Sequence, residues 1–204
     1  MPSLVLGTRN RKKGEELADL LAPWGIELRT LADISHAIDV EEVGDTFAAN
    51  AALKACQQAR HLGLWVLGED SGLAVDALGG QPGVYSARFS GPGATDESNN
   101  HLLLARLGDL PLERRTGHYV CHAVLSDPSG AIRGESECEC HGRIRFTPAG
   151  TGGFGYDPLF EIVEYHRTFG ELGPVVKACL SHRARAIRAL IPTITRLVDS
   201  GEWK

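Results

Sequence analysis

A stretch of polar and cationic residues follows the first apolar run of the chain. It reads Thr8-Arg9-Asn10-Arg11-Lys12-Lys13, and a helical pattern begins within it, with Leu17, Leu20 and Leu21 on one face. At a helix N-terminus, unpaired backbone N–H groups and the helix dipole favour an anion, and a hydroxyl, an amide and cationic side chains add to that preference. The stretch therefore suits a phosphate group. A surface helix capped by Asn10, with its lysines in solvent, fits the same pattern equally well.

Carboxylates occur in two segments that suit a hard cation. Glu42 lies in an acidic segment, and Asp70 follows the apolar residues 64–67, which predict a buried strand. In proteins Mg²⁺ is held by one or two carboxylates together with substrate phosphates. Acidic loops are usually only solvated, but Asp70 is distinguished by its expected place at a strand end, with Ser71-Gly72 leaving the backbone open to approach. We therefore expect Asp70 to be the central carboxylate of a metal site.

Two further segments carry groups that suit a nucleobase. Phe154 and Tyr156 lie among glycines. There they either offer aromatic faces for stacking, worth about 1–3 kcal/mol per base, or anchor a tight loop in the core. His182 and Arg183, at the start of the last expected helix, either supply hydrogen-bond donors for carbonyl groups or form an ordinary basic helix surface.

Strands and helices alternate among the elements expected to position these residues. Apolar runs, helical periodicity and turn residues predict strands at 4–6 and from 26, a helix over 47–61 capped by Thr46, a strand at 64–67, a helix capped by Thr95, a hairpin of 118–125 and 131–141, and a basic helix capped by Ser181. An acidic loop at 33–45 and glycine-rich loops at 79–93 and 149–158 complete the pattern. This order indicates an α/β fold with a mixed sheet.

Composition and charge exclude several classes of protein. The chain has 204 residues, of which 43% are hydrophobic, so it suits one folded unit with a sizeable core. Its 21 basic and 26 acidic residues give a net charge of −5, which opposes general binding to nucleic acid or to a membrane surface. The apolar runs are too short to span a bilayer, and the first residues lack a signal-peptide layout, so we expect a cytoplasmic protein.

Familiar nucleotide and cysteine motifs are absent from the sequence. Neither G-x-x-x-x-G-K-[ST] nor G-x-G-x-x-G after a strand occurs. The five cysteines are odd in number and scattered, which argues against a disulfide framework. Cys138-x-Cys140-His141 suggests a metal clip, but its alternation favours a strand with one buried face.

Seven ordered blocks connect the segments described so far. They are Thr8-x-Asn10-x-x-Lys13; Glu42-Val43-Gly44-Asp45-Thr46-Phe47 with Asn50-Ala51 and Lys54; Asp70-Ser71-Gly72-Leu73; Val75-Asp76-Ala77-Leu78-Gly79-Gly80; Pro82-Gly83-Val84-Tyr85-Ser86-Ala87-Arg88; Gly152-Gly153-Phe154-Gly155-Tyr156-Asp157-Pro158; and Lys177 with Ser181-His182-Arg183. Together they resemble the inosine triphosphate pyrophosphatase family, whose members hydrolyse nonstandard purine nucleoside triphosphates. The resemblance covers nearly the whole chain.

The resemblance implies a role for each matching residue. The triphosphate would be bound by Thr8, Arg9, Asn10, Arg11, Lys12, Lys13 and Lys54. One Mg²⁺ per subunit, replaceable by Mn²⁺, would be held by Glu42 and Asp70, and Asp70 would also be the general base. The nucleotide and base pocket would consist of Ser71, Phe154, Gly155, Tyr156, Asp157, Lys177, His182 and Arg183.

The resemblance also implies a fold and an activity. The fold would be α/β, with a mixed twisted sheet, flanking helices and two lobes around a central active-site cleft, in a single domain over residues 1–204 of a homodimer. The activity would be hydrolysis of dITP, ITP and XTP to a monophosphate and pyrophosphate, which keeps these nucleotides out of DNA and RNA. Two alternatives are a nucleotide-binding sensor without hydrolysis and a phosphatase that releases orthophosphate.

Two positions depart from the family pattern. Glu69 stands where the family often has aspartate, and Val176 stands where an acidic residue usually precedes the pocket lysine. The segment 165–176 departs as well. We therefore expect Glu69 to support the site rather than to catalyse, and the sequence does not predict the loop geometry around Lys177.

Overall fold

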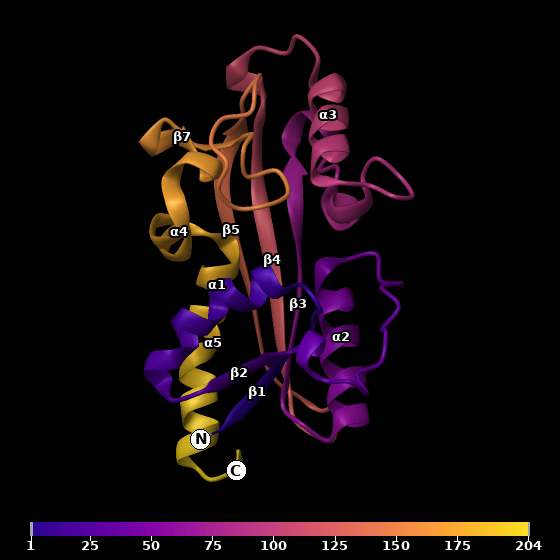
Figure 1. The fold of residues 1–204 in the computed structure, drawn as a ribbon, viewed down its shortest axis with the longest axis vertical. Helices are drawn as coiled ribbons and strands as arrows, with labels where there is room; N and C mark the ends of the chain where they lie inside the picture. The colour runs from indigo at the N-terminus through magenta and orange to yellow at the C-terminus, as the bar shows by residue number, and fades with distance from the viewer. Residues whose placement is uncertain (1, 204) are drawn as a thin grey trace. The chain divides into compact units, whose positions relative to one another are not determined.

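The structure is a computed structural model that describes residues 2–203 (Figure 1). Its helices and strands in chain order are β1 (Ser3–Leu6), α1 (Arg11–Leu21), β2 (Glu27–Thr30), α2 (Phe47–Leu62), β3 (Val66–Val75), α3 (Asp96–Leu107), β4 (Thr116–Ser126), β5 (Ile132–Ile144), β6 (Phe160–Ile162), β7 (Arg167–Thr168), α4 (Phe169–Leu180) and α5 (His182–Asp199). The strands form one sheet in the order β2-β1-β3-β4-β5-β6-β7. Within the described residues, no helix is both long and apolar enough to cross a membrane.

The sheet is mixed, as the sequence predicts. β1 pairs in parallel with β2 and with β3, whereas β6 pairs antiparallel with both β5 and β7. The β4–β5 hairpin turns through residues 127–130, where Gly130 donates its N–H to the Asp127 carbonyl at 2.8 Å. The predicted α/β class is therefore confirmed.

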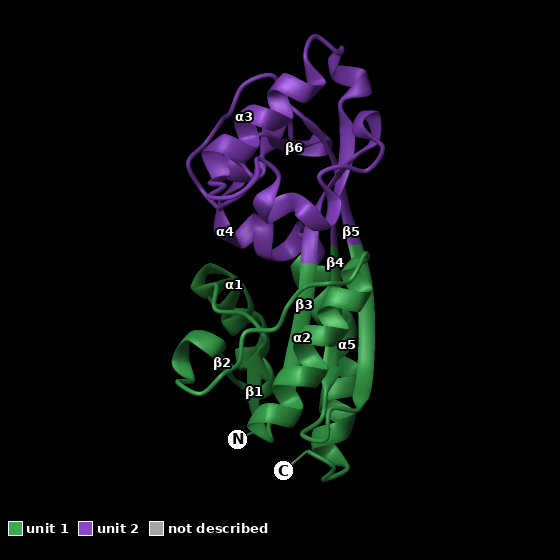
Figure 2. Ribbon diagram, turned by 90° about the vertical axis from the view of Figure 1, so that its right-hand side faces the viewer, with its two compact units in different colours: residues 1–70, 121–138, 183–204 green, residues 71–120, 139–182 purple. Residues whose placement is uncertain are grey.

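The chain divides into two compact units, which Figure 2 shows in green and purple. Unit 1 comprises residues 1–70, 121–138 and 183–204, and unit 2 comprises residues 71–120 and 139–182. Strands β3, β4 and β5 contribute residues to both units. That the chain acts as a single domain with two lobes and no linker stays a prediction.

Unit 1 is a three-layer arrangement. On one face of its strands, leucines of α1 and apolar residues of α5 share a core with Leu4, Leu6 and Leu67. On the other face, Ala51, Ala55 and Ala59 of α2 pack against alternate residues of β1, β3 and β4. α1 connects β1 to β2 along one face of the sheet, and α2 connects β2 to β3 along the other face. The neighbours β2 and β3 thus lie on opposite sides of β1 and are reached over opposite faces of the sheet. The carboxyl ends of β1 and β3 therefore form a topological switch point, where open α/β sheets bind ligands.

Unit 2 has a core of its own. Leu103 and Leu107 of α3 pack with Leu73 and Val75 of β3, and with a group of aromatic residues, namely Tyr119, Tyr156, Phe160 and Phe169. Thr95 caps α3, as predicted, because its side chain accepts the backbone N–H of Ser98. The glycine-rich segment 149–158 forms an irregular loop without a helix or strand.

Four elements differ from the predictions, of which β6 and β7 are short strands that the sequence did not predict. β3 was expected to end before Asp70, but it runs to Val75, so Asp70 lies inside a strand and not in a loop at its end. The reason is that only its partner β1 ends there, with Leu6 paired to Leu67, while β3 stays paired with β4. α4 was not predicted, since Gly173 (φ 75°) and Pro174 interrupt its helical pattern.

Candidate active site

The segment after β1 forms a capped helix start at the switch point. The Asn10 side chain accepts the Lys12 N–H at 3.0 Å, and the Thr8 hydroxyl accepts the Asn10 N–H at 3.2 Å. The predicted cap at Asn10 is thus confirmed, whereas a phosphate at this helix N-terminus stays a prediction. The two arginines turn aside: Arg9 contacts Asp39 at 3.2 Å, and Arg11 lies 3.7 Å from Asp33.

Lys54 on α2 reaches Asp70 on β3. Its ammonium donates to Asp70 Oδ1 at 2.8 Å, and the Asn50 amide donates to Asp70 Oδ2 at 3.2 Å. This contact depends on a close approach of α2 to β3 at Gly68, where an added Cβ would lie 2.3 Å from the Ala51 carbonyl oxygen. Any side chain at Gly68 would push α2, and with it Lys54, away from Asp70.

Glu42 completes a set of donors that suits a hard cation. Its carboxylate lies 3.1 Å from the same Lys54 ammonium that Asp70 binds at 2.8 Å. Both carboxylates therefore converge on one positive atom, and such a pair, completed by substrate phosphates, fits Mg²⁺. Among residues 2–203, no group of three or more His, Cys, Asp or Glu side chains is arranged to hold a metal by itself. That Glu42 and Asp70 hold a metal ion stays a prediction.

Glu69 points to the opposite face of β3 from Asp70, because successive residues of a strand alternate. Its buried carboxylate pairs with the Lys13 ammonium through Oε1 and lies 3.4 Å from Arg183 Nε through Oε2. Arg183 in turn donates to Glu16 at 2.6 Å. The Glu69 side chain therefore cannot bind the same cation as the Asp70 side chain. It instead pairs with Lys13 of α1 and Arg183 of α5.

The buried charges shift one another's pKa values. Burial alone raises the pKa of Glu69, but Lys13 and Arg183 overcome this effect and hold it well below its usual range. Burial raises the pKa of Asp70 above its usual value, although Lys54 opposes the shift. Burial lowers the pKa of Lys54, but Asp70, Glu42 and Glu69 together outweigh it, so the pKa of the ammonium is raised. The pKa of Glu69 is thus lowered and that of Asp70 raised, so Asp70 is the more basic carboxylate of the two. We call Lys13, Glu42, Lys54, Glu69, Asp70 and Arg183 the charged cluster.

The second group of predicted residues lies in unit 2 and centres on Asp157. Its Oδ2 accepts the Lys177 ammonium at 2.6 Å and the Phe154 backbone N–H at 2.9 Å. Gly153 makes this bond possible, because it has φ 76° and an added Cβ would lie 2.0 Å from Asp157 Oδ2. The Lys177 ammonium also lies 4.4 Å from the centre of the Phe154 ring. One carboxylate therefore orders the loop, its aromatic residue and the pocket lysine.

The imidazole of His182 stacks on Tyr119, a residue that the sequence does not single out. Their ring centroids are 4.6 Å apart and the planes differ by 7°. Tyr119 also donates its hydroxyl to Asp157 Oδ1 at 3.4 Å. We call Tyr119, Phe154, Asp157, Lys177 and His182 the aromatic cluster. The alternation of β4 could have marked Tyr119 as buried, but not its partners.

Contacts from α3 fix the remainder of the loop. Gly155 donates its N–H to Asp96 at 2.7 Å, and its carbonyl accepts the Asn100 amide at 2.9 Å. Tyr156 is 3% exposed and donates its hydroxyl to the Ser86 carbonyl at 2.8 Å. Its ring therefore anchors the loop in the core, and of the two aromatic residues only Phe154 stays half-buried. Asp96 and Asn100 are further contributors, and no local pattern in the sequence marks them.

The predicted residues thus separate into two groups by unit. Unit 1 contains Thr8, Arg9, Asn10, Arg11, Lys12, Lys13, Glu42, Lys54, Asp70 and Arg183, and unit 2 contains Ser71, Phe154, Gly155, Tyr156, Asp157, Lys177 and His182. The chain joins the two groups directly at the Asp70–Ser71 and His182–Arg183 peptide bonds. Arg183 was expected beside the base, but its guanidinium is buried among Glu16 and Glu69 in unit 1.

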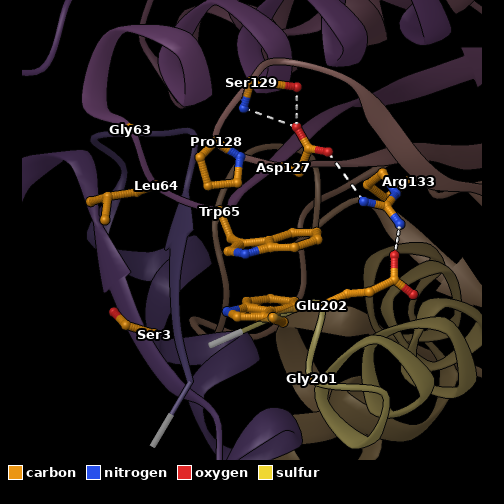
Figure 3. A pocket seen from close by; sticks show the side chains of 11 residues that line it. Ser3, Gly63, Leu64, Trp65, Asp127, Pro128, Ser129, Arg133, Gly201 and Glu202 are labelled. Carbon is orange, nitrogen blue, oxygen red and sulfur yellow. Dashed lines mark hydrogen bonds and ion pairs between the residues drawn. The ribbon is translucent and has the colours of Figure 1, made fainter.

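A separate hollow of about 610 Å³ lies elsewhere in unit 1 (Figure 3). Its lining includes Trp65 and Trp203, whose rings stack at 4.3 Å. Arg133 contacts Asp127 at 3.2 Å and also pairs with Glu202. Since both tryptophans are buried and the polar groups pair with one another, these contacts fasten residues 201–203 to the sheet.

Comparison with known proteins places the chain in a family. Its sequence matches the Ham1 family over residues 4–193, and the chain belongs to that family. A protein of Rhodopirellula baltica named dITP/XTP pyrophosphatase is 56% identical over 200 residues, which cover 98% of this chain and 96% of that protein. One of Geobacter sulfurreducens with the same name is 47% identical over 190 residues, covering 93% and 95%. The resemblance stated from the sequence is thereby confirmed.

Solved structures agree with this assignment. A HAM1 protein from Coxiella burnetii has a TM-score of 0.86 and 34% identity, covering 96% of this chain and all of that one. A protein of Mycobacterium abscessus described as a nucleoside-triphosphatase and dITP/XTP pyrophosphatase has a TM-score of 0.74 and 42% identity, covering 94% and 99%. The fold and the family are therefore supported over nearly the entire chain.

Proposed function

We propose that this protein hydrolyses dITP, ITP and XTP to the nucleoside monophosphate and pyrophosphate, and so removes these nucleotides before they enter DNA or RNA. The names of its relatives support the reaction class. The observation that carries the proposal is the convergence of Glu42 and Asp70 on the Lys54 ammonium. Carboxylates and a lysine in this arrangement suit a metal-bound triphosphate.

The charged cluster is assigned to the triphosphate. Thr8, Arg9, Asn10, Arg11, Lys12 and Lys13 would bind it at the start of α1, and Lys54 would bind it from α2. Glu42 and Asp70 would hold one Mg²⁺, replaceable by Mn²⁺, which when bound would neutralise charge on the phosphates. Lys13 and Lys54 fix the anhydride for in-line attack on the α-phosphorus.

Asp70 is assigned as the general base. Its carboxylate accepts the proton of the attacking water, and its raised pKa strengthens it for this role. Lys54 and Asn50 fix the carboxylate at 2.8 and 3.2 Å, so that it keeps one orientation. Release of the pyrophosphate then leaves a nucleoside monophosphate.

The aromatic cluster is assigned to the base. We infer that the pocket comprises Ser71, Phe154, Gly155, Tyr156, Asp157, Lys177 and His182, with Phe154 offering the half-buried ring for stacking. His182 presents a donor to the 6-oxo group of hypoxanthine or xanthine. An adenine amino group would leave that donor unpaired, which costs about 1–3 kcal/mol.

Product analysis tests the proposal. The protein is incubated with dITP, XTP and dATP in the presence of Mg²⁺, and pyrophosphate and orthophosphate are measured separately. We expect pyrophosphate from the first two and little from dATP. Orthophosphate as the only product would support a γ-phosphatase, and binding without any product would support a sensor. In ¹⁸O-labelled water, the label should enter the monophosphate; label in the pyrophosphate would contradict attack at the α-phosphorus.

The assembly and location are part of the same proposal. We infer a cytoplasmic homodimer that binds nucleotide and neither nucleic acid nor membrane, in keeping with the net charge of −5. Light scattering after gel filtration would give about twice the chain mass of 21.9 kDa. A mass equal to that of a single chain would contradict the dimer.

A further inference from the structure

Tyr119 is buried among aromatic rings of unit 2. It is 7% exposed, and its ring lies 4.7 Å from Phe160 at 56° and 6.3 Å from Phe169 at 40°. Both angles are the tilted arrangements that aromatic pairs prefer. The closer contact, with Phe160, holds the tyrosine ring, which presents one fixed face to His182.

That fixed face sets the plane of the His182 ring. The two rings are almost parallel, with 7° between their planes and 4.6 Å between their centroids. A hydrogen-bond donor discriminates between substrates only if it cannot turn to another partner when the wrong substrate arrives. A stacked imidazole keeps its donor directions within the plane that Tyr119 imposes.

The hydroxyl of Tyr119 reaches the other half of the aromatic cluster. It donates to Asp157 Oδ1 at 3.4 Å, while Asp157 Oδ2 accepts the Lys177 ammonium and the Phe154 N–H. The ring and the hydroxyl thus contact two segments that are far apart in the sequence.

We propose that Tyr119 is a positioning residue for base selection, which fixes His182 by stacking and thereby sets the preference for 6-oxo over 6-amino purines. The inference rests on the proposed function. The ring carries most of the effect, because the stacked contact is close whereas the 3.4 Å hydroxyl contact is long. A stacked aromatic contact corresponds to about a 2- to 10-fold change in an equilibrium.

Two substitutions separate the ring from the hydroxyl. Tyr119→Phe keeps the stacking face, and its ratio of kcat/KM for dITP to that for dATP should stay within about 2-fold of wild type. Tyr119→Leu removes the face, and the ratio should fall by about 10-fold through weaker dITP turnover. If Tyr119→Leu does not fold, Tyr119→Met takes its place, because methionine fills the space with a flexible side chain. The ratio should fall in Tyr119→Met as well.

Phe169→Leu is the matched control for loss of packing. Phe169 is 1% exposed in the same core and contacts Tyr119 and Phe160, and no ring contact joins it to His182 in the described residues. It should lower the melting temperature as the Tyr119 variants do, yet leave the dITP-to-dATP ratio unchanged. All variants are assayed at a temperature at which circular dichroism shows them folded.

The outcomes are distinguishable. A wild-type dITP-to-dATP ratio in Tyr119→Leu and Tyr119→Met would overturn the inference. If the ratio falls as far in Tyr119→Phe as in Tyr119→Leu, the effect belongs to the hydroxyl, and the inference is overturned as well. An equal fall in Phe169→Leu would show a packing effect and overturn it too. If the wild-type protein releases no pyrophosphate from dITP, the proposed function fails instead.

Discussion

The charged cluster and the aromatic cluster solve different problems with different interactions. The charged cluster joins β3 to α1, α2 and α5 through buried ion pairs, such as Lys54 with Asp70 at 2.8 Å and Arg183 with Glu69 at 3.4 Å. The aromatic cluster contains one buried ion pair, Lys177 with Asp157, and is otherwise built from rings and backbone groups.

The difference follows from what each cluster is assigned to bind. A triphosphate requires dense positive charge and carboxylates for a metal, whereas a purine base requires a flat surface and donors in fixed directions. Buried ion pairs contribute little to stability compared with apolar residues of equal volume. Their concentration in unit 1 is therefore better explained by function than by folding.

Metal removal should cause the largest effect and should act through the charged cluster alone. Dialysis against EDTA should lower dITP turnover by more than about 10⁴-fold, which exceeds the loss expected without the general base. Addition of Mg²⁺ or Mn²⁺ should restore the turnover. The melting temperature should hardly change, because both Glu42 and Asp70 still pair with the Lys54 ammonium. Full activity in EDTA would rule out the metal site.

Asp70→Asn should come next. The amide cannot accept the water's proton, so kcat for dITP should fall by about 10²–10⁴-fold while the nucleotide still binds. Turnover is measured by pyrophosphate release and binding by calorimetry. Asp109→Asn, at an exposed position, is the matched control and should behave as wild type. A fully active Asp70 variant would remove the residue from its assigned role.

Glu69→Gln should chiefly affect stability. The side chain is fully buried between Lys13 and Arg183, so its loss leaves two cations without their shared anion and should cost about 3–5 kcal/mol of unfolding free energy. Urea unfolding measures this, with the exposed Glu15→Gln expected within about 0.5 kcal/mol of wild type. A stable Glu69 variant would mean that the charged cluster does not depend on this anion.

The smallest effect concerns the start of α4, the helix that carries Lys177. The Thr168 N–H donates to Glu171 at 2.9 Å and lowers the pKa of Glu171 below its ordinary value of 4.5, with help from the Thr168 hydroxyl. A lowered carboxyl pKa stabilises the fold above the ordinary value, and the contribution is lost as the pH falls through the lowered one.

Glu171→Ala should therefore be less stable than wild type at pH 7, and the difference should shrink as the pH falls below 4.5. Urea midpoints across this range provide the measurement, with the exposed Glu164→Ala as control. A difference that does not change with pH would indicate that the helix start does not use the carboxylate.

The sequence predicted elements whose signals are local. The four-residue spacing of Phe47, Ala51, Ala55 and Ala59 predicted α2 to within one residue of its observed end at Leu62. The alternation of Cys138 and Cys140 correctly favoured a strand over a metal clip, since only Cys140 is fully buried and both lie on β5. Patterns of this kind depend only on which face of an element is buried.

The sequence missed features that depend on distant partners. Nothing near Glu69 reveals that it faces Lys13 and Arg183 while Asp70 faces Lys54, because the two faces of β3 are defined only once α1, α2 and α5 have packed. The same holds for Tyr119, which became notable through the position of His182. The length of β3 depended on pairing with β4 beyond the end of β1.

The most direct test of the comparison measures kcat/KM for dITP and dATP in Lys13→Ala and in His182→Ala. We expect Lys13→Ala to lower both values by the same factor, because the two substrates share their triphosphate. His182→Ala should lower the dITP value by about 10-fold and leave the dATP value nearly unchanged, since only the 6-oxo base uses its donor. A selective loss in Lys13→Ala, or an equal loss in His182→Ala, would contradict the assignment of phosphate and base to the two clusters.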